Sequence, residues 1–286
     1  MKVKLLVDST CDLPLEYLQE NNVEVIPLLV TFKEEEYKDL IEITGEKLYQ
    51  KVEELGVLPK TASRSIGSFI ETYEKIFSEG YDQIVYISIG SKLSGTVQNA
   101  RLASDDYEGK IFIHDSNNLS TGIGLQVIKA VELIKEGKTA EEIASYLSEY
   151  APKVRSQFAV ESLDFLYKGG RCSQTSYKFG KGFKIKPIIR VVYGGLFVYK
   201  KVIGKMVNAL NKQLEIFKED LENADLSKIM ITHSFADESA KYLFEQLKQY
   251  VPEENIMVTN AGCVISSHCG KGTTSTLYTC KYSNRK

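Results

Sequence analysis

The chain has 286 residues, with 36 Lys and Arg against 38 Asp and Glu, so its formal net charge at pH 7 is −2. This balance argues against a dedicated nucleic-acid or anionic-membrane binder, which carries a strong net positive charge. Apolar residues make up 43% of the chain, which is typical of a globular protein, and a length near 290 favours two domains over one.

The first half of the chain alternates strand and helix patterns. Short apolar runs predict strands over residues 3–7, 23–32, 84–89 and 111–113. Apolar residues at helical spacing predict helices over residues 15–20, 44–55, 69–77, 97–103, 123–134 and 139–150, the last with a capping box formed by Thr139 and Glu142. This order implies parallel strands joined by right-handed crossovers, and therefore an N-terminal three-layer α/β/α domain with a mainly parallel sheet.

The pattern changes near Pro152. Strands are predicted over residues 157–162, 187–192, 195–202 and 228–232 and around Val264 and Leu277, with helices over 206–217 and 238–250. Gly194 and Gly195 between two strand patterns favour a hairpin. We expect an α/β/α domain over residues 1–152 and a C-terminal two-layer α+β domain with a mixed sheet over residues 153–286.

The five cysteines are an odd number and form no C-x-x-C pair, which argues against disulfides and zinc and favours a reducing compartment. The longest apolar stretch, residues 23–32, is interrupted by Glu24 and Pro27 and is too short to span a bilayer. Asp8 ends the first apolar run too early for a secretory signal. We therefore expect a soluble, cytoplasmic protein without a bound metal.

Hydroxyl-rich loops follow three predicted strands, at residues 8–12, 90–96 and 115–122. Because the carboxyl ends of parallel strands meet at one edge of a sheet, these loops should lie together, beside helix N-termini that suit an anion. A single loop of this kind is typical of ordinary helix capping, but three together favour a ligand site. A fourth cluster, residues 60–65, holds more hydroxyls than helix capping requires, which also favours a ligand.

The usual catalytic signatures are absent: the chain has no nucleophile elbow, P-loop or H-E-x-x-H motif. The chain has three histidines, His114, His233 and His268. For each of them the default interpretation is a structural one, in which the side chain is packed and hydrogen-bonded. His268 is the best functional candidate because serines and glycines surround it. Cys263 and Cys269 beside it do not have the spacing of a structural zinc site.

Several motifs, in this order, resemble those of the DegV family. They are Asp8-Ser9-Thr10-Cys11-Asp12, Ser91-x-Leu93-Ser94-Gly95-Thr96, Asp115-Ser116, Leu163-x-x-Leu166-x-x-Gly169-Gly170-Arg171, and the loop around His268. The resemblance covers essentially the full length, and the combination of the second and fourth motifs is specific.

The resemblance implies a bacterial fatty-acid-binding protein of phospholipid metabolism that is not an enzyme and needs no cofactor. Such a protein holds one long-chain fatty acid at the domain interface and presents it to a fatty acid kinase, which makes acyl-phosphate from ATP. By motif position, Thr61, Ser94 and His268 correspond to the carboxylate-binding residues, and Arg171 to the residue that engages the kinase. The supporting loops carry Ser9, Ser63, Gly95, Thr96 and Ser116. Arg64 and Lys271 depart from the family pattern near the headgroup.

The residue chemistry agrees with this interpretation. Two hydroxyls and an imidazole can supply the hydrogen-bond donors that a buried carboxylate needs. The alternative is a phosphoryl- or acyl-transfer enzyme that acts on a small polar metabolite through the same loops, with His268 as base or nucleophile. A long apolar cavity would favour the carrier, and a small polar cavity would favour the enzyme.

Residues 168–205 contain ten basic residues and no Asp or Glu, so the near-zero net charge conceals a basic segment. We interpret this segment, which includes Lys200, Lys201 and Lys205 as well as Arg171, as a docking face for an acidic partner or, transiently, an anionic membrane surface. Nucleic-acid binding would need an aromatic platform, and the chain has no Trp.

Overall fold

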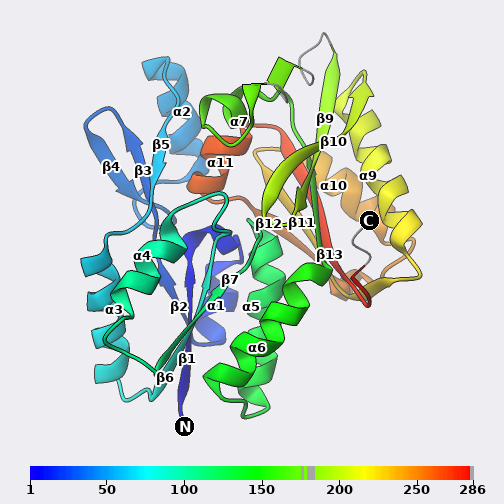
Figure 1. Ribbon diagram of the computed structural model, residues 1–286. Coiled ribbons are helices and arrows are strands. Elements are labelled where there is room, and N and C mark those ends of the chain that lie inside the picture. Colours follow the sequence, from blue (N-terminus) through cyan, green and yellow to red (C-terminus); the bar gives the residue numbers. More distant parts are fainter. Residues whose placement is uncertain (175–176, 179–183, 284–286) are drawn as a thin grey trace.

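The computed structural model describes residues 1–174, 177–178 and 184–283. The N-terminal domain is built on four parallel strands in the order β2-β1-β6-β7 (Figure 1). Their bounds are β1 Val3–Asp8, β2 Val23–Ile26, β6 Gln83–Ser88 and β7 Ile111–Asp115. The parallel sheet predicted from the strand and helix alternation is confirmed.

Helices cover both faces of this sheet. Neighbouring residues of each strand point to opposite faces, so Leu6 packs with α3 (Ile66–Ser78) and α4 (Thr96–Ala103), whereas Leu5 packs with the helices on the other face. Those helices are α1 (Leu15–Glu20), α5 (Thr121–Lys135) and α6 (Ala140–Tyr150). The predicted capping box of Thr139 and Glu142 opens α6.

The segment between β2 and α3 forms a small sheet that the sequence did not predict as such. Pro27 divides the predicted 23–32 strand into β2 and β3 (Leu29–Phe32), because proline has no N–H to donate to a ladder. An antiparallel sheet in the order β4-β3-β5 follows, with β4 at Glu35–Lys38 and β5 at Lys60–Ala62, and α2 (Gly45–Leu55) beside it. Thr61 pairs with Val30 in this sheet, which fixes its position.

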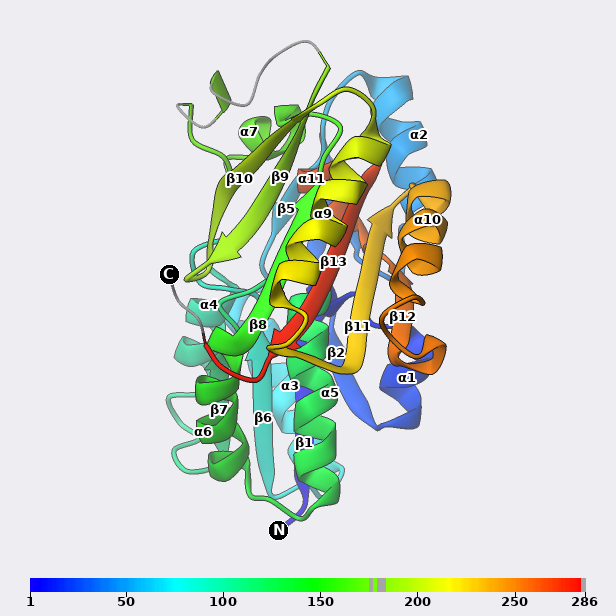
Figure 2. The ribbon, with the colours of Figure 1, turned by 90° about the vertical axis from the view of Figure 1, so that its right-hand side faces the viewer.

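The C-terminal domain has a six-stranded mixed sheet in the order β10-β9-β8-β13-β11-β12. The strands are β8 Val154–Ala159, β9 Ile185–Val192, β10 Gly195–Ile203, β11 Ala224–Ser234, β12 Ile256–Asn260 and β13 Thr273–Cys280. Within this sheet β11 and β12 pair in parallel, and the other neighbours pair antiparallel. Helices α9 (Met206–Asp220) and α10 (Asp237–Leu247) cover its outer face (Figure 2).

The predicted hairpin is present between β9 and β10. Its turn residues Tyr193 and Gly194 have φ values of 49° and 76°, the left-handed conformations that a tight type I′ connection requires. The predicted mixed sheet of the C-terminal domain is therefore confirmed. The predicted domain boundary at residues 152 and 153 stays a prediction.

The strand predicted around Val264 is wrong, because this segment is a helix, α11 (Cys263–Cys269). A short apolar run does not distinguish a strand from a buried helix by its periodicity. The backbone N–H of Cys263 donates to Asp39, which lies 224 residues earlier in the chain, so the contact that caps the helix is invisible to a local pattern. The preceding strand β12 and the short helix α7 (Asp164–Lys168) were also missed.

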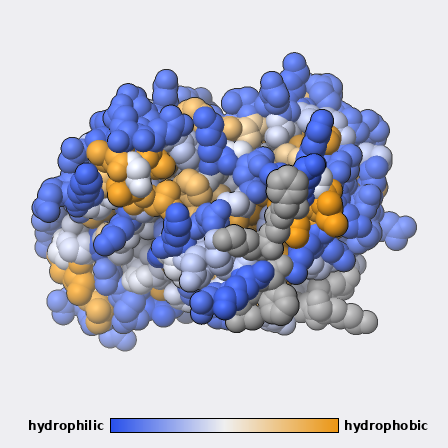
Figure 3. Space-filling view, turned by 90° about the horizontal axis from the view of Figure 1, so that it is seen from above, coloured by the Kyte–Doolittle hydropathy of each residue, from blue (hydrophilic) through white to orange (hydrophobic). Residues whose placement is uncertain are grey.

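Figure 3 views the molecule from the end where α2, α7 and α11 lie, and shows a mostly hydrophilic surface interrupted by apolar patches. In the part of the chain that the structure describes, no helix is both long and apolar enough to cross a membrane.

Candidate ligand site

A cavity lies where the carboxyl-end loops of the N-terminal sheet meet α7, β10 and α11 of the other domain. The cavity has a volume of about 50 Å³, within about 530 Å³ of space between atoms that is partly open to solvent. Its polar lining residues are Thr61, Ser94, Arg171 and His268; the remaining ones are Leu28, Ala62, Ile89, Leu93, Leu119, Leu166, Leu196, Val264, Ile265 and Cys269. The cavity wall is therefore mainly apolar.

Thr61 and His268 meet across the domain interface. Thr61 Oγ1 lies 2.7 Å from His268 Nε2, whereas the buried His268 Nδ1 has no hydrogen-bond partner among the described residues. A lone pair without a donor costs less than an N–H without an acceptor, so we assign the proton to Nε2. Nε2–H then donates to Thr61 Oγ1, which leaves the Thr61 hydroxyl proton available to a ligand.

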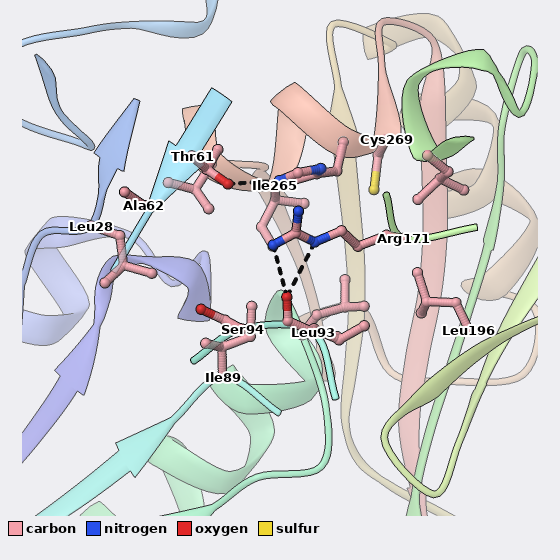
Figure 4. Close-up of a pocket in the computed structure, with 14 residues that line it drawn as sticks. Leu28, Thr61, Ala62, Ile89, Leu93, Ser94, Arg171, Leu196, Ile265 and Cys269 are labelled. Atoms are coloured by element: carbon pink, nitrogen blue, oxygen red, sulfur yellow. Dashed lines mark hydrogen bonds between the residues drawn. The ribbon is translucent and has the colours of Figure 1, made fainter. Parts of the chain in front are cut away.

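Ser94 reaches the cavity from the loop between β6 and α4 (Figure 4). Its Oγ lies 2.8 Å from Thr96 Oγ1 and accepts from the Thr96 backbone N–H at 3.3 Å. Because Ser94 Oγ already accepts a hydrogen bond, its own O–H can donate into the cavity. The loop thus offers a second hydroxyl donor.

Arg171 lies in the cavity wall rather than on the outer surface. Its Nε and Nη2 donate to the Leu93 carbonyl at 3.1 and 2.9 Å (Figure 4). Its Nη1 donates to the Gly169 carbonyl at 2.6 Å. Burial lowers the pKa of its guanidinium. Among the described residues no carboxylate forms a salt bridge with Arg171, so its charge favours an anion in the cavity.

The four polar residues form a connected group. Thr61 bonds His268, Arg171 acts electrostatically on His268, and Arg171 also holds the carbonyl next to Ser94. Burial, followed by the charge of Arg171, lowers the pKa of His268 to about 4. The imidazole is therefore neutral at pH 7, and the polar end of the cavity has hydroxyl donors, one neutral ring and one positive charge.

The other predicted residues lie around the cavity but do not line it. Ser9, Ser63 and Ser116 bond neighbouring backbone or side-chain groups, Gly95 is the N-cap residue of α4, and Thr96 bonds Ser94. The convergence of the hydroxyl-rich loops is present: the Gly90 N–H donates to the Asn118 carbonyl, and the Ser120 hydroxyl donates to Asp12. Most of these hydroxyls thus serve the fold, and Ser94 is the one from the three loops that lines the cavity.

The two departures from the family pattern lie away from the cavity wall. Arg64 Nη2 donates to Ser68 Oγ at 3.2 Å, and Lys271 Nζ lies 5.6 Å from the centre of the Phe235 ring. Neither residue lines the cavity. Lys200, Lys201 and Lys205 also lie outside it, on and after β10, and all three are exposed. Lys181 of the basic segment lies outside the described residues.

A second, smaller cavity of about 20 Å³ adjoins the first and shares Leu119, Ile265 and Cys269 with it. It lies against the inner face of the C-terminal sheet, next to Phe158 and Leu277. Its serine and threonine hydroxyls have partners, for example Thr232 with Thr121 and Ser234 with Ser266. Although many of the lining residues are serines and threonines, their hydroxyls bond to other protein groups, so the cavity presents an apolar surface.

Sequence reasoning did not single out Asp12 and Asp39, two buried carboxylates that bond the first residues of α11. Asp12 belongs to a quoted motif, but nothing in the sequence signals its partner 250 residues away. In the described ranges, no group of three or more His, Cys, Asp or Glu side chains is placed to hold a metal ion.

The fold and the cavity together define a two-domain α/β protein with a mainly apolar cavity at the domain interface and polar groups joined at one side. A family model described as "Uncharacterised protein, DegV family" matches residues 2–281. The chain belongs to the DegV family.

Relatives and solved structures agree with this assignment over nearly the whole chain. A DegV domain-containing protein of Clostridium perfringens is 34% identical, with 98% of this chain and 99% of the relative covered. A fatty acid-binding protein of Thermotoga maritima is 30% identical, with 96% of each covered. The structure of a DegV family protein from Thermus thermophilus, described as showing fatty acid binding, superposes with a TM-score of 0.90 at 30% identity and covers 98% of this chain and 100% of its own.

The His268 environment predicts a pH effect on stability. Its folded pKa is about 4, below the usual 6.5, so this residue contributes stability that is present above pH 6.5 and is lost as the pH falls toward 4. Between about pH 7.5 and about pH 5, wild-type protein should lose roughly 1–2 kcal/mol more unfolding free energy than H268Q, whose amide does not titrate. Urea unfolding at both pH values measures this; equal losses would mean that His268 titrates normally.

Proposed function

We propose that this protein binds one long-chain fatty acid, with the tail in the apolar cavity and the carboxylate at Thr61, Ser94 and His268. One observation carries the proposal: these three side chains, from three separate parts of the sequence, line the same apolar cavity beside the uncompensated charge of Arg171. The relatives described as fatty-acid-binding proteins support it.

The apolar wall supplies most of the affinity. Burial of each methylene contributes about 0.8 kcal/mol, so a chain of about 16 carbons offers on the order of 10 kcal/mol before the cost of ordering it. The second cavity, which begins at Leu119, Ile265 and Cys269, extends the space for the tail. A small polar metabolite would leave these walls without contacts, so the cavity does not favour the alternative of a transfer enzyme.

The carboxylate needs donors once it leaves water. In our proposal the hydroxyls of Thr61 and Ser94 donate to its two oxygens, and the neutral His268 orients Thr61. Arg171 stabilises the negative charge without giving up its bonds to the two backbone carbonyls. This set of donors suits a carboxylate, and we propose that the protein is a carrier rather than an enzyme.

We further propose that the protein presents the bound acid to a fatty acid kinase in the cytoplasm, where the kinase transfers the γ-phosphoryl group of ATP to the carboxylate. In this proposal Arg171 contacts the headgroup end of the cavity, and the exposed Lys200, Lys201 and Lys205 of the same basic segment provide the docking charge. All five cysteines are free thiols, which fits a reducing compartment.

Ligand content tests the binding proposal. Organic extraction of purified protein followed by mass spectrometry should release roughly one fatty acid per chain, as one headgroup site requires. T61V and S94A should each weaken binding of a fluorescent fatty acid about tenfold, because each removes one donor to a buried carboxylate. Arg64→Ala, outside the cavity wall, is the control and should bind as wild type. Delipidated wild-type protein that takes up no fatty acid would refute the proposal.

Charge reversal tests the docking proposal. The triple variant K200E/K201E/K205E should bind fatty acid as wild type does, yet raise the apparent KM of the kinase for the loaded carrier about tenfold or more, since opposite charges guide the encounter. A matched triple reversal in the N-terminal domain, K110E/K135E/K138E, should leave that KM unchanged. If both triple variants behave alike, the surface that contains Lys200, Lys201 and Lys205 is not the docking site.

A further inference from the structure

The helix that carries His268 is held at its start by the other domain. Asp12 Oδ1 accepts from the Gly262 backbone N–H at 2.9 Å, and Asp39 Oδ1 accepts from the Cys263 backbone N–H at 2.8 Å. Both carboxylates are buried, with 3% and 0% of their surface exposed. They therefore satisfy N–H groups at the start of α11 that no residue of the helix itself can reach.

The two carboxylates are themselves fixed in place. The Ser120 hydroxyl donates to Asp12 Oδ2 at 2.6 Å, and the Ser9 hydroxyl donates to Asp39 Oδ2 at 2.9 Å. The fit against the helix is tight, because a Cβ added at Gly262 would lie 3.2 Å from both Asp12 Oδ1 and Asp39 Oδ2. Ser9, predicted as a supporting residue of the site, thus acts through Asp39 rather than on the cavity.

Helix α11 depends on these contacts for its position. With seven residues it is far too short to be stable alone. The Tyr49 hydroxyl donates to the Ser266 carbonyl at 3.4 Å, and Thr61 bonds His268, so the N-terminal domain contacts the helix at its start, middle and end. Rotation by one residue would turn His268 by about 100° and break its bond to Thr61.

We propose that Asp12 and Asp39 are positioning residues of the headgroup site: by capping α11 they fix the rotation and height of the helix that places His268 against Thr61. The proposal rests on the proposed function for its ligand, but the positioning itself can be measured without one. The ionised carboxylate of Asp39 also suits the positive end of the helix.

The arrangement costs folding free energy. Burial raises the pKa of Asp39 to about 6 and raises that of Asp12 as well. The stability that protonated Asp39 contributes is present below pH 3.8 and is lost as the pH rises through about 6. Near pH 7 the buried, ionised carboxylate therefore lowers the free energy of unfolding. An Asn at position 39 keeps the oxygen that accepts from Cys263 and removes this cost. Asn at position 39 removes only the charge, whereas Ala removes both the charge and the capping oxygen. Comparing the two substitutions therefore separates the effect of capping from the effect of the charge.

The test compares D39A and D39N with Y278F, which loses a hydrogen bond to Asp220 on the outer face of the C-terminal sheet, away from α11. Hydrogen exchange of ligand-free protein should show the amides of residues 266–270 opening at least tenfold faster in D39A, and near the wild-type rate in D39N and Y278F. The affinity for a fluorescent fatty acid should be about tenfold weaker in D39A and unchanged in D39N and Y278F.

Each outcome decides one question. Wild-type protection of α11 in D39A would overturn the positioning role, as would equal loss in D39A and D39N, since Asn retains the capping oxygen. If wild-type protein binds no fatty acid, the proposed function fails, while the exchange rates still report whether Asp39 holds the helix. If D39A does not fold, Asp12→Asn and Asp12→Ala repeat the comparison at Gly262.

Discussion

The hydrogen bond between Thr61 and His268 is the contact on which the site depends. It joins β5 of the small antiparallel sheet to α11, two elements 207 residues apart in sequence, and it closes one side of the cavity between the domains. Two further contacts place these side chains. Strand β5 is held by its pairing with β3, and α11 is held by carboxylates of the N-terminal domain.

The chemistry of the cavity follows from burial. Removing a carboxylate from water is costly unless donors replace the water. In our proposal two hydroxyls are these donors, the neutral imidazole orients one of them, and the guanidinium contributes its charge. Burial keeps His268 neutral, so one positive charge, that of Arg171, balances one negative charge of the proposed ligand. In the proposed function the apolar walls contact the acyl chain, so the affinity should rise with acyl length.

Sequence patterns predicted those parts of the structure that local rules control. Alternating apolar runs were enough for the parallel sheet, and Thr139 with Glu142 predicted the start of α6. The residues Thr61, Ser94 and His268 came from motif position, and the cavity contains all three. The segment at Val264 was misassigned because a seven-residue helix has little periodicity of its own, and its caps come from Asp12 and Asp39 in the other domain.

Arg171 shows a second limit of sequence reasoning. The motif position suggested a docking residue, whereas its guanidinium lies in the cavity wall and holds the carbonyl of Leu93. The sequence could not reveal this placement, because Leu93 lies 78 residues earlier.

The most direct measurement of the central claim is the ¹³C NMR signal of hexadecanoic acid labelled at its carboxyl carbon and bound to this protein. The account predicts one bound resonance that stays ionised through the pH range where the free acid titrates, and that moves in T61V but not in Y278F. A bound resonance that titrates like the free acid and is indifferent to T61V would place the carboxylate in solvent and contradict the account.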